Sequence, residues 1–193
     1  MRFEIAGYLP REFTFSIIIA LSALTVALLY GAWLGNQIPA NEAEEIVESM
    51  DEEIEQLTSQ TVFMRALHIF INNFGLSLLT LAPFVGWGWM LLITYNTGFI
   101  LGSFAQTLPG DPIARLLLTL FVVFIFPGLP VALLEFGAYI LLFGESIYLS
   151  YLALTRSGVR ERLTRHSWKT LLIYVAMLFV GAMIESVMMG FQL

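Results

Sequence analysis

The residues of this chain that could do chemistry in apolar surroundings are one glutamate and three asparagines. Glu135 follows the sequence Pro127-Gly128-Leu129-Pro130, and Asn72, Asn73 and Asn96 lie earlier in apolar runs. Carboxylate and amide oxygens bind cations, a carboxyl group carries a proton, and broken helices form such sites in transporters. Exposing any of these four side chains to lipid costs free energy, so we expect them to converge inside a helical bundle as a polar intramembrane cluster.

The same residues admit a structural interpretation. Pro127, Gly128 and Pro130 are predicted to break a helix, and backbone NH groups freed there need acceptors. Glu135 would accept such hydrogen bonds, and the asparagines would bond between helices at about 0.6–2 kcal/mol each. We favour this interpretation and keep ion or proton binding as the alternative.

Enzymatic chemistry is not indicated by any motif. The two histidines, His68 and His166, form no H-x-x-x-H or H-E-x-x-H pattern. Cysteine is absent, which excludes disulfides, thiolate metal sites and cysteine nucleophiles. We expect no enzymatic activity, no cofactor, no metal site and no nucleic-acid partner.

Composition assigns the chain to the integral membrane proteins. Hydrophobic residues make up 58% and charged residues 12%, with a mean hydropathy of +0.81. Soluble domains are about 45–50% apolar and about 25% charged. The apolar run at 13–34 is too long for a signal-peptide core, so we interpret it as a retained first helix. We therefore expect one multi-pass domain over 1–193 in the cell membrane, with the lipid bilayer as a partner.

The apolar pattern predicts an all-α transmembrane bundle. Residues 113–126 form a shorter apolar segment, whose about 14 residues cover roughly 21 Å of a ~30 Å hydrocarbon core. Small residues four apart, at Gly31 and Gly35 and at Gly98 and Gly102, predict close helix packing. The predicted membrane helices lie at about 12–34, 62–81, 85–104, 131–154 and 168–189.

Residues 42–57 predict an amphipathic helix outside the membrane. Apolar residues recur there at 3–4 residue spacing, from Val47 through Met50 and Ile54 to Leu57. The acids lack the alternation and central glycine of an EF-hand loop, so we interpret them as a solvated face rather than a cation site. The acidic residues are Glu42, Glu44, Glu45, Glu48, Asp51, Glu52, Glu53 and Glu55.

Basic residues indicate the orientation of the chain. Arg2 and Arg11 flank the N-terminus, residues 156–169 contain five Lys or Arg, and residues 38–61 contain none. The positive-inside rule places the N-terminus and the basic loop in the cytoplasm and the acidic helix outside. Six full spans would put the basic loop outside. We therefore favour five spans plus a re-entrant half-helix at 113–126, with six spans as the alternative, and interpret the basic loop as a topology signal.

The order of the polar residues resembles the stage II sporulation protein M family. In that family an Asn-Asn pair, a later Asn and a Pro-His-Gly-x-x-Glu motif follow one another. Here Asn72-Asn73, Asn96 with Gly98, and the segment 130–135 match over roughly residues 60–155. Val131 and Ala132 replace the His and Gly of the motif, so no role of that histidine carries over.

The resemblance implies a membrane scaffold, since the sporulation member organises peptidoglycan-degrading partners during engulfment. Engulfment itself is not implied for this chain. Two classes of function follow. The first is a non-enzymatic scaffold or accessory protein with a membrane or cell-envelope protein partner, or a second copy of the chain. The alternative is a small transporter or channel component centred on Glu135.

Overall fold

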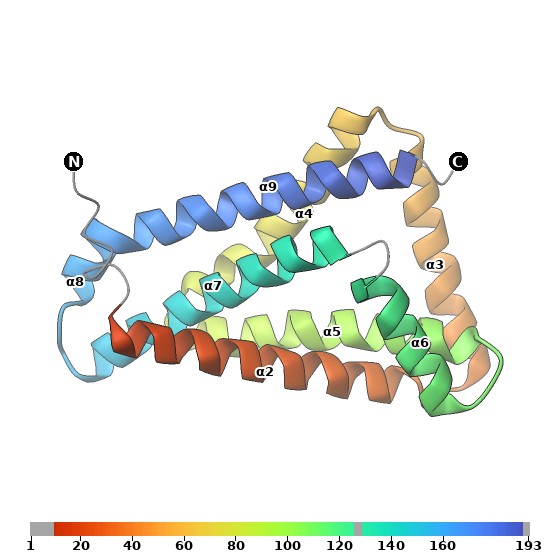
Figure 1. Cartoon of the computed structure of the whole chain (residues 1–193), viewed down its shortest axis with the longest axis horizontal. Coiled ribbons are helices and arrows are strands. Elements are labelled where there is room, and N and C mark those ends of the chain that lie inside the picture. The colour runs from red at the N-terminus through yellow and green to blue at the C-terminus, as the bar shows by residue number, and fades with distance from the viewer. Residues whose placement is uncertain (1–9, 126–128, 191–193) are drawn as a thin grey trace.

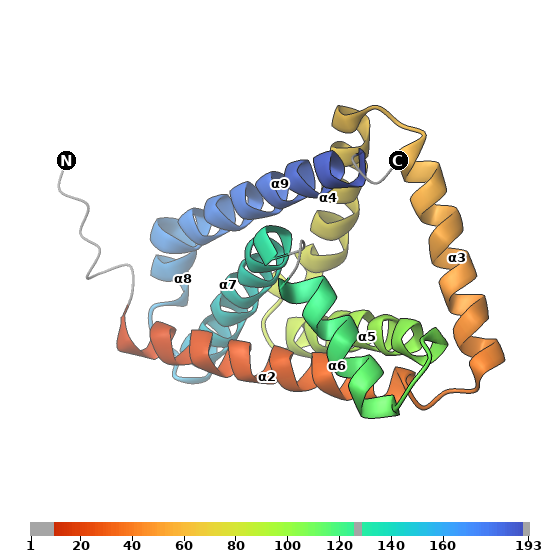
Figure 2. The same cartoon turned by 45° about the vertical axis from the view of Figure 1, so that its right-hand side comes forward.

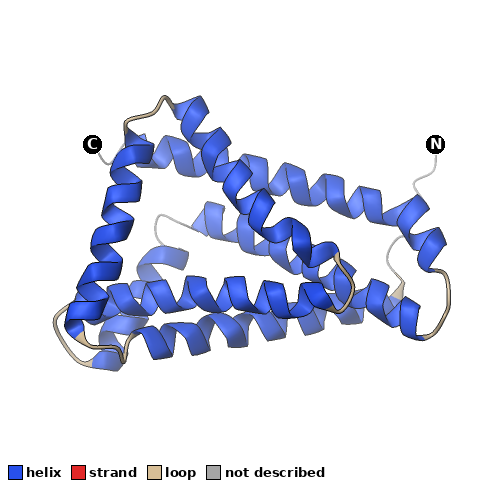
Figure 3. Ribbon diagram, turned by 180° about the vertical axis from the view of Figure 1, so that it is seen from behind, coloured by secondary structure: helices blue, strands red, loops and turns tan. Residues whose placement is uncertain are grey.

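The computed structural model describes residues 10–125 and 129–190. Every regular element in these residues is a helix, and no strand occurs in them (Figure 3). Pro127 and Gly128 of the predicted break lie outside the described residues. The prediction of an all-α fold is confirmed.

The helices begin and end close to the predicted positions, with one difference: the segment after residue 158 is helical rather than a loop. Its first turn leads through a π-helical turn into the last helix. The elements are α2 (Arg11–Gly35), α3 (Ala40–Thr58), α4 (Val62–Leu78), the 3₁₀ turn η1 (Leu79–Leu81), α5 (Val85–Thr107), α6 (Pro112–Ile125), α7 (Leu129–Leu154), α8 (Val159–Arg162), the π-helical turn η2 (Leu163–Ser167) and α9 (Trp168–Gly190).

The long helices lie lengthwise, and α3 and α8 lie at opposite ends of them (Figure 1). Helix α3 stands across one end, from the end of α2 to the start of α4 (Figure 2). The start of α2 lies at the other end, beside α8. Helix α6 runs from the end nearest α3 towards the start of α7. The acidic helix and the basic segment are therefore far apart.

Four stretches of helix are long and apolar enough to cross a membrane: Arg11–Gly35, Val62–Leu81, Leu129–Leu154 and Val159–Gly190. Helix α6 is shorter, with 14 residues. Helix α5 has 23 residues but is not among the four, because glycines and polar residues interrupt its apolar sequence. These helices indicate a membrane protein, and the number of spans stays a prediction.

The contact between α2 and α5 is made by the four glycines of the small-residue pattern. A Cβ atom on Gly31 would lie 2.9 Å from the backbone nitrogen of Phe99, and one on Gly98 would lie 3.0 Å from that of Ala32. Gly35 and Gly102 meet the opposing backbone in the same way. No side chain fits at these positions, so the two backbones touch, as in other small-residue helix pairs.

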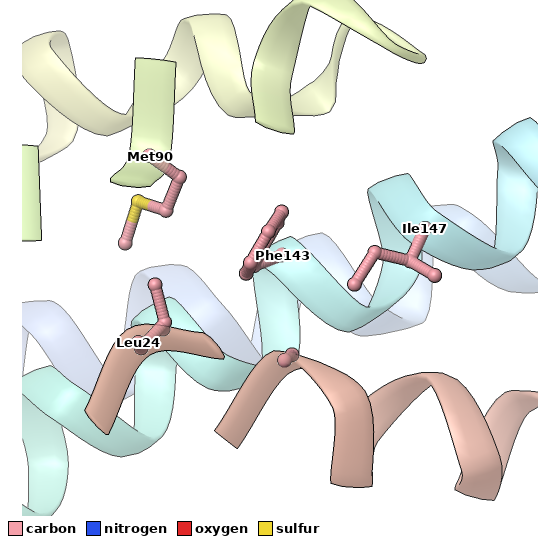
Figure 4. Packing of buried hydrophobic residues seen from close by; sticks show 5 residues of the cluster. Leu24, Met90, Phe143 and Ile147 are labelled. Atoms are coloured by element: carbon pink, nitrogen blue, oxygen red, sulfur yellow. The ribbon is translucent and has the colours of Figure 1, made fainter. Parts of the chain in front are cut away.

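Helix α7 is the centre of the apolar packing. Leu24, Met90, Phe143 and Ile147 form a buried cluster that joins α2, α5 and α7 (Figure 4). A second cluster, which includes Leu142, joins α7 to α9. Packing on both sides fixes α7 and hence the position of the glutamate near its start.

Candidate functional site

Glu135 lies between three helices. The Asn73 side chain on α4 donates a hydrogen bond from Nδ2 to Glu135 Oε1 at 3.0 Å. On the other side, a Cβ atom on Gly181 of α9 would lie 3.1 Å from Glu135 Cγ. The absence of a side chain at Gly181 therefore lets α9 pack directly on the stem of Glu135. Two of the predicted functional residues, Asn73 and Glu135, are brought together.

A cavity of about 440 Å³ adjoins this pair, and we call it the carboxylate cavity. Glu185 lines it together with Glu135, and the two carboxylates are close enough to interact electrostatically. Glu185 follows Gly181 by four residues, so both lie on the face of α9 that meets α7. The other lining residues come from five helices and include Leu28, Thr94, Val123, Val131, Phe136, Tyr139 and Met188.

Asn72 and Asn96 do not belong to this site, because both are exposed. Asn72 is one residue from Asn73, and successive residues of an α-helix point about 100° apart. Asn96 is two residues from Gly98, which faces α2, so Asn96 points to the opposite side of α5. The predicted convergence of four polar residues is therefore wrong, and one pair of them remains.

Glu185 was not among the predicted site residues, because no motif and no helix break marks its position in the sequence. Its spacing of four residues from Gly181 becomes informative only once Gly181 is known to contact Glu135. Among the described residues, no group of three or more His, Cys, Asp or Glu is placed to hold a metal ion. The carboxylate cavity therefore presents two carboxylates, which can bind protons or a cation.

A second candidate region is α3, whose last turn is fixed by a buried arginine. Arg65, 3% exposed, donates to the backbone oxygens of Leu57 and Thr58 at 3.0 Å each. It also donates to the oxygens of Gln60 at 3.1 Å and Ser186 of α9 at 3.0 Å. All four acceptors are neutral, and a cation at carbonyls near the end of a helix is favourable. Arg65 therefore fixes α3 to both α4 and α9.

The start of α3 is fixed as well. Asn36, 3% exposed, lies just after α2 and donates from Nδ2 to the Pro112 oxygen at 2.8 Å. Arg115 of α6 donates from Nε to Asn36 Oδ1 at 2.9 Å and from Nη1 to the Gln106 oxygen of α5 at 3.1 Å. Ala43 in the first turn of α3 is fully buried. The ends of α2 and α5 and the starts of α3 and α6 thus form one junction.

Between these anchors the acidic side chains of α3 are exposed. None of them forms an ion pair with another described residue. We call this surface the acidic face, and it consists of Glu42, Glu44, Glu45, Glu48, Asp51, Glu52, Glu53 and Glu55. It is a rigidly mounted, uncompensated negative surface at one end of the molecule.

At the opposite end the structure corrects our interpretation of the basic segment as a topology signal alone. Arg162 is buried and donates from Nε to Glu145 Oε1 at 2.8 Å and from Nη2 to Oε2 at 2.5 Å. Ser167 and Thr170 donate to the same carboxylate at 2.7 and 3.0 Å. The guanidinium also lies 4.4 Å from the centre of the Phe13 ring. This bidentate pair fixes α8 to α7 and α2.

Comparison with known proteins identifies a family. The family model described as Stage II sporulation protein M matches residues 16–188. No curated protein and no solved structure matches the chain. The match covers far more of the chain than the motifs at 60–155 on which the resemblance rests.

Proposed function

The chain belongs to the stage II sporulation protein M family, and from this premise we propose that it is a non-enzymatic membrane scaffold or accessory protein. The observation that carries the proposal is the mounting of α3. Arg65 and the junction at Asn36 hold the helix at both ends, while the acidic face points away from the bundle. A surface held in place before binding loses little conformational entropy when a partner docks.

The charge of the acidic face defines the partner as a basic segment of another membrane or cell-envelope protein. Opposite charges speed association over roughly a Debye length, about 8 Å at physiological salt, and select against acidic partners. A second copy in the same orientation is a poorer fit, because the basic segment lies at the other end of the molecule. The proposed partner is therefore a different protein.

We place the acidic face outside the cell and the basic segment and the start of α2 in the cytoplasm. The separation of α3 and α8 supports this orientation together with the positive-inside rule. The shortness of α6, and the junction that fixes its start beside the ends of α2 and α5, support a re-entrant half-helix within a five-span bundle. Single cysteines at Asp111 and Ser157 are expected to be labelled from opposite sides. Labelling of both from one side would contradict the five-span arrangement.

A photo-crosslinking amino acid at Glu48 tests the scaffold proposal in native membranes. We expect a discrete protein adduct that weakens when the flanking acids are neutralised as Glu44→Gln and Glu52→Gln. The matched control is Glu12→Gln, an exposed acid at the start of α2, which should leave the adduct unchanged. Crosslinking at Leu117, an exposed apolar residue of α6, should give lipid adducts instead.

Two results would contradict the scaffold proposal. One is that Glu48 gives only lipid adducts, as Leu117 does. The other is a protein adduct that persists undiminished after neutralisation of Glu44 and Glu52, since the acidic face would then not select the partner. An adduct of twice the chain's own mass would assign the surface to a second copy.

A further inference from the structure

We propose that the carboxylate cavity binds an organic cation, an ammonium group with an apolar body, whose charge lies against Glu135 and Glu185. This binding site is separate from the scaffold function and from the acidic face of α3. It follows from three features of the cavity: an incompletely satisfied pair of acids, an apolar wall, and aromatic rings beside the acids.

The acids of the cavity accept few hydrogen bonds from the described residues. Glu135 accepts one hydrogen bond, from Asn73 at 3.0 Å, and Glu185 accepts none from any described residue. When both are ionised, the two carboxylates also repel each other, and apolar walls provide little to stabilise their charge. A positively charged donor between them would donate hydrogen bonds to both carboxylates and remove the repulsion.

The rest of the cavity is suited to an apolar group rather than to a hydrated inorganic ion. Leu28, Val123, Val131 and Met188 line it. Its volume of about 440 Å³ falls in the range of about 300–1,000 Å³ that is typical of small-molecule pockets, which combine apolar walls with a few polar groups. A metal ion would leave most of this wall without contacts.

Aromatic residues lie on the same helix as the first acid. Phe136 and Tyr139 line the cavity, adjacent to Glu135 and one turn after it. Aromatic faces attract ammonium groups within about 6 Å of the ring centre, and this attraction strengthens when the site excludes water. Acids with neighbouring aromatic rings favour a cation that is bound partly desolvated, which again selects an organic ammonium group.

Fluorine NMR of the full chain in nanodiscs tests the proposal, with 4-fluorobenzylammonium as the probe and empty nanodiscs as the blank. We expect line broadening beyond the blank, and a dissociation constant that rises at least tenfold in Glu135→Gln and in Glu185→Gln. Ala132 lines the cavity, so Ala132→Leu narrows it while keeping both carboxylates, and this variant should also abolish binding. The matched control is Glu53→Gln on the acidic face, which should bind as the wild type does.

Several outcomes would overturn the inference. Equal binding of the neutral 4-fluorobenzyl alcohol would show that charge is not recognised. Competition by sodium ions at the same concentration as the amine would assign the pair to an inorganic cation. Unchanged binding in both glutamine variants, or in Ala132→Leu, would place the probe elsewhere. Hydrogen exchange first checks that the glutamine variants fold as the wild type does. If either glutamine variant is unfolded, Ala132→Leu tests whether the probe binds in the cavity.

Discussion

Replacing Arg65 by methionine tests whether one buried guanidinium mounts α3. Methionine keeps most of the side-chain length and removes all donors. Four hydrogen bonds from a charged group, at about 1.5–3 kcal/mol each, would sum to roughly 6–12 kcal/mol. Water reaches part of the end of α3 and replaces some of the lost hydrogen bonds. The substitution also removes the desolvation cost of a buried guanidinium, which is several kcal/mol. We expect a net loss of about 3 kcal/mol, roughly a 100-fold change in equilibrium.

The loss should be local, because three of the four acceptors lie at the end of α3 and in the turn after it. Hydrogen exchange of the protein in nanodiscs should therefore show faster exchange over residues 54–60 and little change in α2 and α5. The matched control is Arg11→Met, an exposed arginine expected to change stability by no more than about 0.5 kcal/mol. Equal protection of α3 in Arg65→Met and Arg11→Met would refute the reasoning.

Two further predictions concern the packing of the bundle, and thermal unfolding in micelles measures both. Arg162→Met should cost about 3–5 kcal/mol by leaving the Glu145 carboxylate buried without its cation, whereas Arg162→Met with Glu145→Leu should cost less; equal losses would show that the pair is not coupled. Gly98→Ala should cost about 1–3 kcal/mol because its methyl group meets the backbone of α2. Gly88→Ala, where a Cβ atom meets nothing within 4 Å, should be neutral or stabilising, so similar losses at the two glycines would contradict the close contact.

Apart from the helical segment after residue 158, the helices could be predicted from the sequence because each one leaves a local signal. Each long apolar run and the acidic amphipathic pattern is contained within about 25 residues. Asp111 accepts hydrogen bonds from the NH groups of Ile113 and Ala114 at 2.9 and 3.2 Å, so α6 begins next to the predicted start at residue 113. The two glycine pairs likewise predict close helix contacts. They do not predict that the pair Gly31 and Gly35 packs against the pair Gly98 and Gly102.

The candidate site was predictable only in part, because its contacts join distant residues. Asn73 and Glu135 were identified by the cost of burying polar groups in lipid, and the same argument wrongly included Asn72 and Asn96. This cost applies to every polar residue in an apolar helix, but the sequence does not show which face of each helix packs. Glu185 could not be assigned to the site without knowing that α9 lies against α7 at Gly181.

The contacts of two arginines were also not predictable, because their partners leave no signal in the sequence. Arg65 and Arg115 bind mainly neutral carbonyl oxygens where helices end, the side of the helix dipole that favours a cation. A carboxylate partner would leave a sequence trace as a compensating charge, whereas a backbone carbonyl leaves none. A structural role of Arg65 and Arg115 could therefore not be predicted from the sequence. Arg65 donates directly to the last turn of α3, and Arg115 holds Asn36, which lies four residues before α3 begins. The free-energy cost of burying the Arg65 guanidinium is therefore linked to the position of the helix that carries most of the protein's acids.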